Sequence, residues 1–195
     1  MKTALLLLGL ALAATGCTIG NSAIPIDPPP LSDEQTLFQF RQDADIRDWK
    51  IAEDAVQSGR SPARLFINKA GNAIFAGDVS PENGRGFFSV QYDFAPIDVS
   101  SCRAVFIWLK GDGKRYQLRV QSDKKDGQAY ACDFQTSGNW QAVEIPFSNM
   151  YAVIQGDHVD LPNYPGQKMT SFQILIASNQ PGSFQLEIDK IWLKQ

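Results

Sequence analysis

The sequence predicts an all-β protein, a jelly-roll β-sandwich of two packed antiparallel sheets. Apolar residues recur at every second position in short runs, and clusters of turn residues separate these runs. No long stretch places apolar residues at helical spacing. The pattern yields eight or nine strands, a number that fits two packed sheets.

The first 16 residues have the pattern of an export signal. Lys2 supplies a positive charge, and the apolar run from Ala4 to Ala14 is shorter than the roughly 20 residues of a membrane-spanning helix. Small residues then precede Cys17, which resembles a lipobox, where the signal is cut before a cysteine that becomes lipidated. We therefore expect a lipoprotein signal peptide over 1–16 and a lipid anchor on Cys17. The alternative is an ordinary secretory signal with an incidental cysteine.

Residues 17–36 are expected to form a tether between anchor and domain. Four prolines, at positions 25, 28, 29 and 30, favour a semi-extended chain. Thr18 follows the lipobox cysteine, whereas an aspartate there usually marks retention in the inner membrane. For a Gram-negative host, this implies an outer-membrane lipoprotein facing the periplasm. Residues 37–195 remain for the β-sandwich, the size of one domain.

The charge balance argues against nucleic acid as a partner. The chain has 18 Lys and Arg against 21 Asp and Glu, a net charge of −3. The one lysine pair, Lys124-Lys125, stands between Asp123 and Asp126. Binding to phosphates needs a basic stripe, and the sequence has none.

In the first half of the domain, Phe38 and Phe40 start the β pattern. Strand candidates follow over 73–79, 86–94, 103–110, 116–120 and 130–134, separated by turns rich in Gly, Asp and Asn. The segment Gly111-Asp112-Gly113 is expected to be a hairpin turn and not a phosphate loop, because no helix follows it.

In the second half, strand candidates cover 143–147, 172–177 and 184–193, and residues 148–168 are expected to be irregular. Pro146 predicts an edge strand or a bulge, because proline cannot donate to a ladder. Phe184, Leu186 and Ile188 share one face, but the next large apolar residue is Ile191. This shift from period two predicts a bulge near Asp189.

The strand over 103–110 is apolar on both faces. Val105, Ile107 and Leu109 occupy one face, and Ala104, Phe106 and Trp108 the other. Either a second layer covers the second face, or Phe106 and Trp108 form an exposed aromatic surface. The candidate binding surface comprises these two residues together with Tyr151 and Tyr164 from the irregular stretch.

Two cysteines lie within the domain. An oxidising periplasm permits a disulfide between Cys102 and Cys132. Strand parity, however, points Cys102 away from the core and Cys132 into it, so two free thiols are the alternative.

The sequence offers little for catalysis. His158 is the single histidine, and although Asp157 and Asp160 lie beside it, one histidine in a polar loop is a weak metal signal. No Gly-x-Ser-x-Gly elbow is present. We therefore predict no catalytic residues, no metal ligands and a non-enzymatic protein, with a glycoside hydrolase that uses two carboxylates as a minor alternative.

Several stretches occur in an order that resembles a known family. They are Trp49 to Val56, Phe75 to Phe87, Lys110 to Tyr116, Trp140 with Ile145-Pro146-Phe147, and Phe184 to Ile191. Over about residues 38–193 they resemble the complex I intermediate-associated protein 30 family, which has a galactose-binding-like jelly roll. Two departures, Gln57-Ser58-Gly59 for Met-Gly-Gly and Gln155-Gly156 for Arg-Gly, fall in the loops expected to touch a partner.

The resemblance implies a chaperone-like role, because mitochondrial relatives assist assembly of NADH:ubiquinone oxidoreductase. The leading hypothesis is thus a non-enzymatic binding or assembly module tethered to the envelope, with a protein partner there. The alternative is a carbohydrate-binding module that binds an oligosaccharide. No cofactor is expected, although related jelly rolls often bind a structural Ca²⁺ through loop carboxylates.

Overall fold

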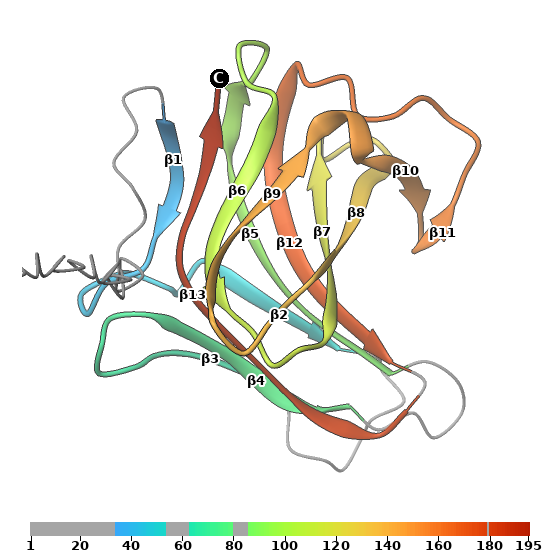
Figure 1. Ribbon diagram of the computed structural model, residues 1–195. Coiled ribbons are helices and arrows are strands. Elements are labelled where there is room, and N and C mark those ends of the chain that lie inside the picture. The colour runs from blue at the N-terminus through green and yellow to red at the C-terminus, as the bar shows by residue number, and fades with distance from the viewer. Residues whose placement is uncertain (1–33, 54–62, 80–85, 179) are drawn as a thin grey trace, which may run out of the picture.

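The computed structural model describes residues 34–53, 63–79, 86–178 and 180–195. In this part of the chain nearly all regular structure is β, and two antiparallel sheets pack face to face (Figure 1). The prediction of an all-β sandwich is confirmed. The expected signal peptide, Cys17 and the tether up to residue 33 lie outside the described residues. No helix of the described residues has the length and apolar character to cross a membrane.

The first sheet, called sheet A, is organised around its longest strand. Its strands are β1 (Glu34–Gln39), β3 (Arg64–Ile67), β4 (Ala73–Val79), β6 (Ala104–Lys110), β9 (Trp140–Pro146) and β13 (Gly182–Lys194). The order is β3-β4-β13-β6-β9. On one side, β13 pairs first with β4 and then, over its second half, with β1. On its other side it pairs with β6.

The second sheet, sheet B, has the order β11-β10-β8-β7-β12-β5-β2. Its strands are β2 (Trp49–Glu53), β5 (Gly86–Asp98), β7 (Arg115–Gln121), β8 (Ala129–Gln135), β10 (Tyr151–Ile154), β11 (Asp157–His158) and β12 (Lys168–Ser178). A single 3₁₀ turn, η1 (Phe147–Asn149), leads from sheet A to β10. The β10–β11 hairpin forms one end of sheet B and projects at the right of Figure 1.

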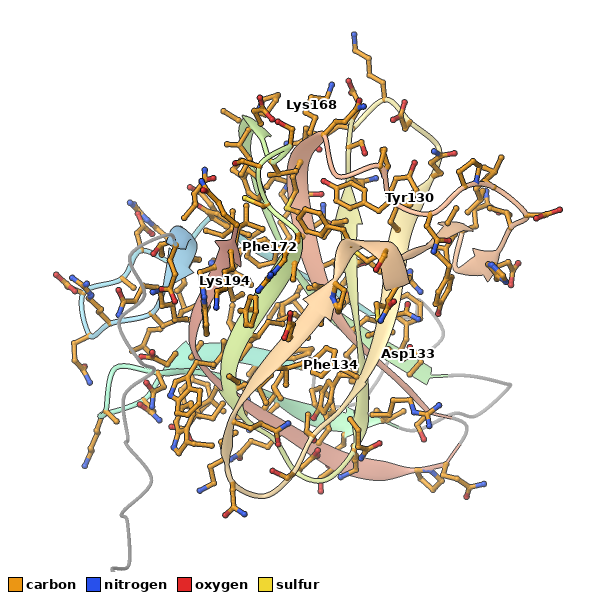
Figure 2. The ribbon with its side chains drawn as sticks, turned by 45° about the horizontal axis from the view of Figure 1, so that its top comes forward. Tyr130, Asp133, Phe134, Lys168, Phe172 and Lys194 are labelled. Carbon is orange, nitrogen blue, oxygen red and sulfur yellow. The ribbon has the colours of Figure 1, made fainter. Side chains whose placement is uncertain are left out.

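The core lies between the sheets and is filled by the apolar side chains that occupy every second position of each strand. Phe172 of β12 is fully buried in the middle of the molecule (Figure 2). Around it, the rings of Trp49, Tyr92 and Phe94 have centroids 5.4, 5.8 and 6.0 Å away. Each buried aromatic side chain of this kind stabilises the fold by about 1.5–3 kcal/mol relative to exposure. The alternation seen in the sequence therefore decides which face of each strand meets the other sheet.

Several local predictions can be compared with the structure directly. The strand over 73–79 is confirmed, and Pro146 does lie in an edge strand, β9. The register of β13 shifts between Ile188 and Lys190, which confirms the bulge. The prediction that residues 148–168 are irregular is wrong in part, because they contain β10 and β11. The predicted boundary at residue 37 falls inside β1.

The disulfide that the sequence permits is not formed: Cys102 and Cys132 are free thiols, as in the alternative. Cys102 precedes β6 in a turn where its N–H donates to the carbonyl of Val99 at 2.9 Å, so strand parity does not extend to it. Both cysteines are partly buried and pack against the core, Cys132 from β8 of the opposite sheet. Burial raises the pKa of the Cys132 thiol.

Candidate functional site

The four aromatic residues predicted to form one binding surface lie in three separate places. Phe106 and Trp108 are on the outer face of sheet A. There, the Phe106 ring stacks on Trp192 of β13 at 5.4 Å and the Trp108 ring on Trp140 of β9 at 5.9 Å. Trp108 is only 7% exposed. The two faces of β6 are thus apolar for different reasons. The side chains of one face enter the core, and the aromatic side chains of the other face stack on rings of neighbouring strands.

Tyr164 belongs to the core, so its placement on a binding surface was wrong. Its ring lies 5.1 Å from that of Tyr130 and 5.0 Å from that of Phe147, and its hydroxyl donates to the carbonyl of Lys168 at 2.8 Å. Burial raises the pKa of Tyr164. Figure 2 shows Tyr130 and Lys168 toward the same end of sheet B, where this cluster closes the sandwich.

Tyr151 is the one member of the predicted set on the outer face of sheet B, beside a cleft. The cleft has a volume of about 550 Å³, within the range of ligand sites. Alanine, valine and leucine side chains contribute apolar surface to it. Its polar lining is dominated by amides, namely Gln91, Gln121, Gln128, Gln155 and Gln173.

Strand register brings these residues together. Gln173 of β12 stands opposite Gln91 of β5 on one side and opposite Arg119 of β7 on the other. Arg119 in turn stands opposite Ala131 of β8, and Ala131 opposite Tyr151 of β10. Because side chains alternate between faces, all of these point away from the core on the same side of the sheet.

Hydrogen bonds fix the orientation of the polar side chains. Gln173 Nε2 donates to Ser89 Oγ at 2.9 Å. On β7, Arg119 Nε donates to Gln117 Oε1 at 2.6 Å. Gln117 Nε2 donates onward to Asp133 Oδ1 at 2.9 Å and to the Tyr151 hydroxyl at 3.1 Å. The outer face therefore presents an arrangement of amides that is held in place before any ligand arrives.

The carboxylate of Asp93, near the β5 end of this face, is already neutralised. Asp93 accepts hydrogen bonds from Lys50 Nζ and from Gln91 Nε2, each at 2.7 Å, and Lys124 Nζ lies 3.5 Å away. Burial alone would raise the pKa of Asp93, but the hydrogen bonds from Lys50 and Gln91 outweigh it and the pKa is lowered. Asp93 is thus a charged structural group with its partners in place.

The β10–β11 hairpin forms one wall of the cleft. Its two-residue turn, Gln155-Gly156, has positive φ at both residues, 53° and 94°, as a type I′ turn requires. A Cβ added to Gly156 would lie 3.8 Å from Arg119 Nη2, so the turn backbone packs close to the guanidinium. The departure from the family pattern at Gln155-Gly156 therefore lies in the lining of the cleft.

His158 follows this turn and is exposed. Its ring meets that of Tyr151 edge to face, with centroids 5.0 Å apart. Among the described residues, no group of three or more His, Cys, Asp or Glu side chains is placed to hold a metal ion.

Sequence reasoning missed Arg119 and the glutamines. Their signal was the polar parity of strands whose apolar parity was read correctly, such as Gln117, Arg119 and Gln121 between Tyr116, Leu118 and Val120. Polar residues are ordinary at solvent-facing strand positions and therefore do not by themselves indicate a site. Here the unusual feature is amides on three neighbouring strands.

The sandwich and its amide-lined cleft define the class of protein as a jelly-roll domain with a polar cleft on the outer face of one sheet. The family model of complex I intermediate-associated protein 30 (CIA30) matches residues 38–188, and the chain belongs to this family. Its resemblance to that family in sequence motifs is thereby confirmed.

Two relatives are both named mitochondrial complex I intermediate-associated protein 30. The mouse protein is 25% identical over 88% of this chain, and the Drosophila melanogaster protein is 25% identical over 81% of it. The matches cover 60% and 62% of those proteins, so the chain spans less than two thirds of the relatives' length.

Solved structures support the fold. A family 11 carbohydrate-binding module from Clostridium thermocellum, in complex with a β-1,3-1,4-mixed-linked tetrasaccharide, superposes with a TM-score of 0.58 at 18% identity, covering 85% of this chain and 97% of the module. An agarase, AgWH50C, gives a TM-score of 0.57 at 11% identity over 84% of this chain and 24% of its own. These likenesses establish the jelly-roll architecture.

Proposed function

We propose that this domain is a non-catalytic binding module whose ligand site is the cleft on the outer face of sheet B, and that the ligand is an oligosaccharide. One observation carries the proposal: the cleft is lined by five glutamines interspersed with apolar side chains. A carboxamide both donates and accepts hydrogen bonds, as does each hydroxyl of a sugar. A cleft of this composition is therefore suited to a chain of hydroxyl groups.

The lining also supports a role without catalysis. Hydrolysis of a glycosidic bond ordinarily needs two carboxyl groups that face each other across the sugar. Among the described residues that line the cleft, Asp157 is the single acidic one, and it lies on the exposed hairpin.

The second candidate is a chaperone-like assembly role, which membership of the family favours. A protein client would be expected to dock on a contiguous apolar patch. The exposed large apolar side chains are instead spread over four segments of the described chain, at Ile51, Phe66, Ile154 and Leu161. The geometry thus favours a polar ligand over an apolar protein surface.

Calorimetric titration of the purified protein with a panel of neutral and acidic oligosaccharides tests the proposal. We expect micromolar binding to at least one chain, weakened about tenfold by Gln173→Ala, which removes an amide from the middle of the cleft. The matched control is Gln185→Ala, an exposed glutamine on β13 of the other sheet. Absence of binding across the panel, or equal binding by both variants, would contradict the proposal.

Crosslinking from the cleft separates the two candidates further. A photoreactive residue at Gln121 should capture no complex I subunit if the ligand is a saccharide. Recovery of those subunits, together with no saccharide binding, would favour the assembly role.

The proposal includes an envelope tether through Cys17, supported by the lipobox-like residues before it. Expression of the Cys17→Ser variant should move the protein from the membrane fraction to the soluble fraction. An unchanged distribution would refute the anchor without affecting the cleft.

A further inference from the structure

Arg119 occupies a special position in the cleft, at the middle of its floor. It is on β7, flanked in register by Gln173 and Ala131. Its side chain is half-buried, whereas Arg115, at the start of the same strand and with the same parity, is exposed. The close backbone of Gly156 adds a wall on the hairpin side.

The guanidinium has no ion-pair partner among the residues that the structure describes. Its Nε–H donates to the neutral Gln117 amide, and that amide separates it from the carboxylate of Asp133. The other cations around this face are matched differently. Lys50 and Lys124 pair with Asp93, and Lys168 pairs with Asp123 at 2.8 Å.

Arg119 therefore holds a positive charge that is partly removed from water and that no described carboxylate neutralises in an ion pair. Burial lowers its pKa, although attraction to Tyr151 and Asp133 acts in the opposite sense. Charges withdrawn from water are favourable only when a partner compensates them. With Nε engaged, the two Nη groups remain as a fork, and the geometry of that fork matches a carboxylate.

We infer that Arg119 makes the cleft selective for acidic oligosaccharides, with a sugar carboxylate receiving two hydrogen bonds from its Nη groups. This inference rests on the proposed function, because it names the class of saccharide that the cleft binds. The glutamines hold the hydroxyls of the chain, and Arg119 fixes the position of the acidic residue. Asp93 and Asp133, engaged by Lys50 and Gln117, are kept from competing for the guanidinium.

The test compares two probes with one backbone. Tetragalacturonic acid carries carboxylates, and its fully methyl-esterified form has the same chain without the charge. Calorimetric titration should give an affinity at least about tenfold higher for the acid, and added NaCl should reduce that preference. Arg119→Gln should abolish the preference while the thermal midpoint of unfolding stays close to that of the parent.

Arg115→Gln is the matched control, since it removes the same charge from the same face of the same strand but outside the cleft lining. It should keep the preference for the acid. Equal affinity for acid and ester in the parent, or a preference that survives Arg119→Gln, would overturn the inference. If neutral saccharides bound the cleft in that case, the proposed function would stand alone; if no saccharide bound, both would fail.

Discussion

At the scale of single residues, Asp112 accepts four hydrogen bonds outside the cleft. It lies in the turn between β6 and β7, and its Oδ1 accepts hydrogen bonds from Lys114 N–H and the Tyr116 hydroxyl, each at 3.2 Å. Its Oδ2 accepts from Lys114 Nζ at 2.9 Å and from the backbone N–H of Gln185 at 3.1 Å. One carboxylate therefore joins the turn to both sheets.

The pKa of Asp112 reflects these bonds. Burial would raise it, but the hydrogen bonds from Lys114 and Gln185 prevail and the pKa falls below its ordinary value of 3.8. A carboxyl whose folded pKa is depressed stabilises the protein fully above its unfolded pKa. That contribution is lost as the pH falls through 3.8 and then through the lower folded value.

We predict that Asp112→Asn lowers the free energy of unfolding by about 1–3 kcal/mol at pH 7, because an amide N–H₂ would then face the donors at Oδ2. Urea unfolding of parent and variant over a pH series measures the effect. The difference between the two proteins should shrink below about pH 4. A difference that stayed constant with pH would show that charge at Asp112 does not matter.

At the scale of elements, the β10–β11 hairpin is short and depends on its turn. Glutamine at the first position of a type I′ turn is unfavourable, because positive φ is tolerated better by asparagine or glycine. The strands on either side contribute only two register pairs, Val153 with His158 and Ile154 with Asp157. Hairpin stability is therefore set largely at Gln155.

We predict that Gln155→Asn stabilises the hairpin by about 0.5–1 kcal/mol by relieving the strain of positive φ. Hydrogen exchange should slow by a few fold at the Val159 amide, which donates to the Ala152 carbonyl across the hairpin at 3.1 Å, while global unfolding in urea changes little. Gln167→Asn, at an exposed loop position, is the control and should alter neither quantity. Faster exchange in Gln155→Asn would contradict the turn assignment.

The elements also show how far the sequence could be interpreted. Strands of seven or more residues with one apolar face, such as β4 and β7, were predictable because their period is visible within the strand. Each of the strands β3, β10 and β11 has four residues or fewer, which is too few to display a period.

The candidate site was harder to predict than the strands, for a related reason. Gln91, Arg119 and Gln173 are distant in sequence and become neighbours only through the pairing of β5, β12 and β7. The sequence analysis selected aromatic residues instead, but Trp108 and Tyr164 pack against other rings within the fold. The alternation along a strand identifies which side chains face away from the core. The order of the strands in the sheet determines which of those side chains become neighbours.

At the scale of the whole molecule, an ion pair ties the first described strand to the last. Lys190 Nζ of β13 lies 2.7 Å from Glu34 Oε2 of β1, and the two side chains are 15% and 7% exposed. The Lys190 ammonium also lies 5.1 Å from the centre of the Trp192 ring. Removing one partner from such a pair leaves the other charge buried and uncompensated.

We predict that Glu34→Ala lowers the free energy of unfolding by about 3–5 kcal/mol. The double variant Glu34→Met, Lys190→Met should recover most of that loss, because both charges are then gone. Arg47→Ala breaks an exposed pair with Asp45 and should leave the urea midpoint unchanged. A double variant no more stable than Glu34→Ala would contradict the account of an uncompensated charge.

The position of β13 in sheet A has a consequence for biosynthesis. In sheet A, the pair β3–β4 and the pair β6–β9 are joined only by β13. This strand follows all four of them in the chain. During synthesis, the inner edges of β4 and β6 remain unpaired until residues 182–194 emerge. For that interval the nascent chain presents open backbone edges of the kind that invite pairing with other molecules. A chaperone that shields those edges would act on this protein before its own cleft exists.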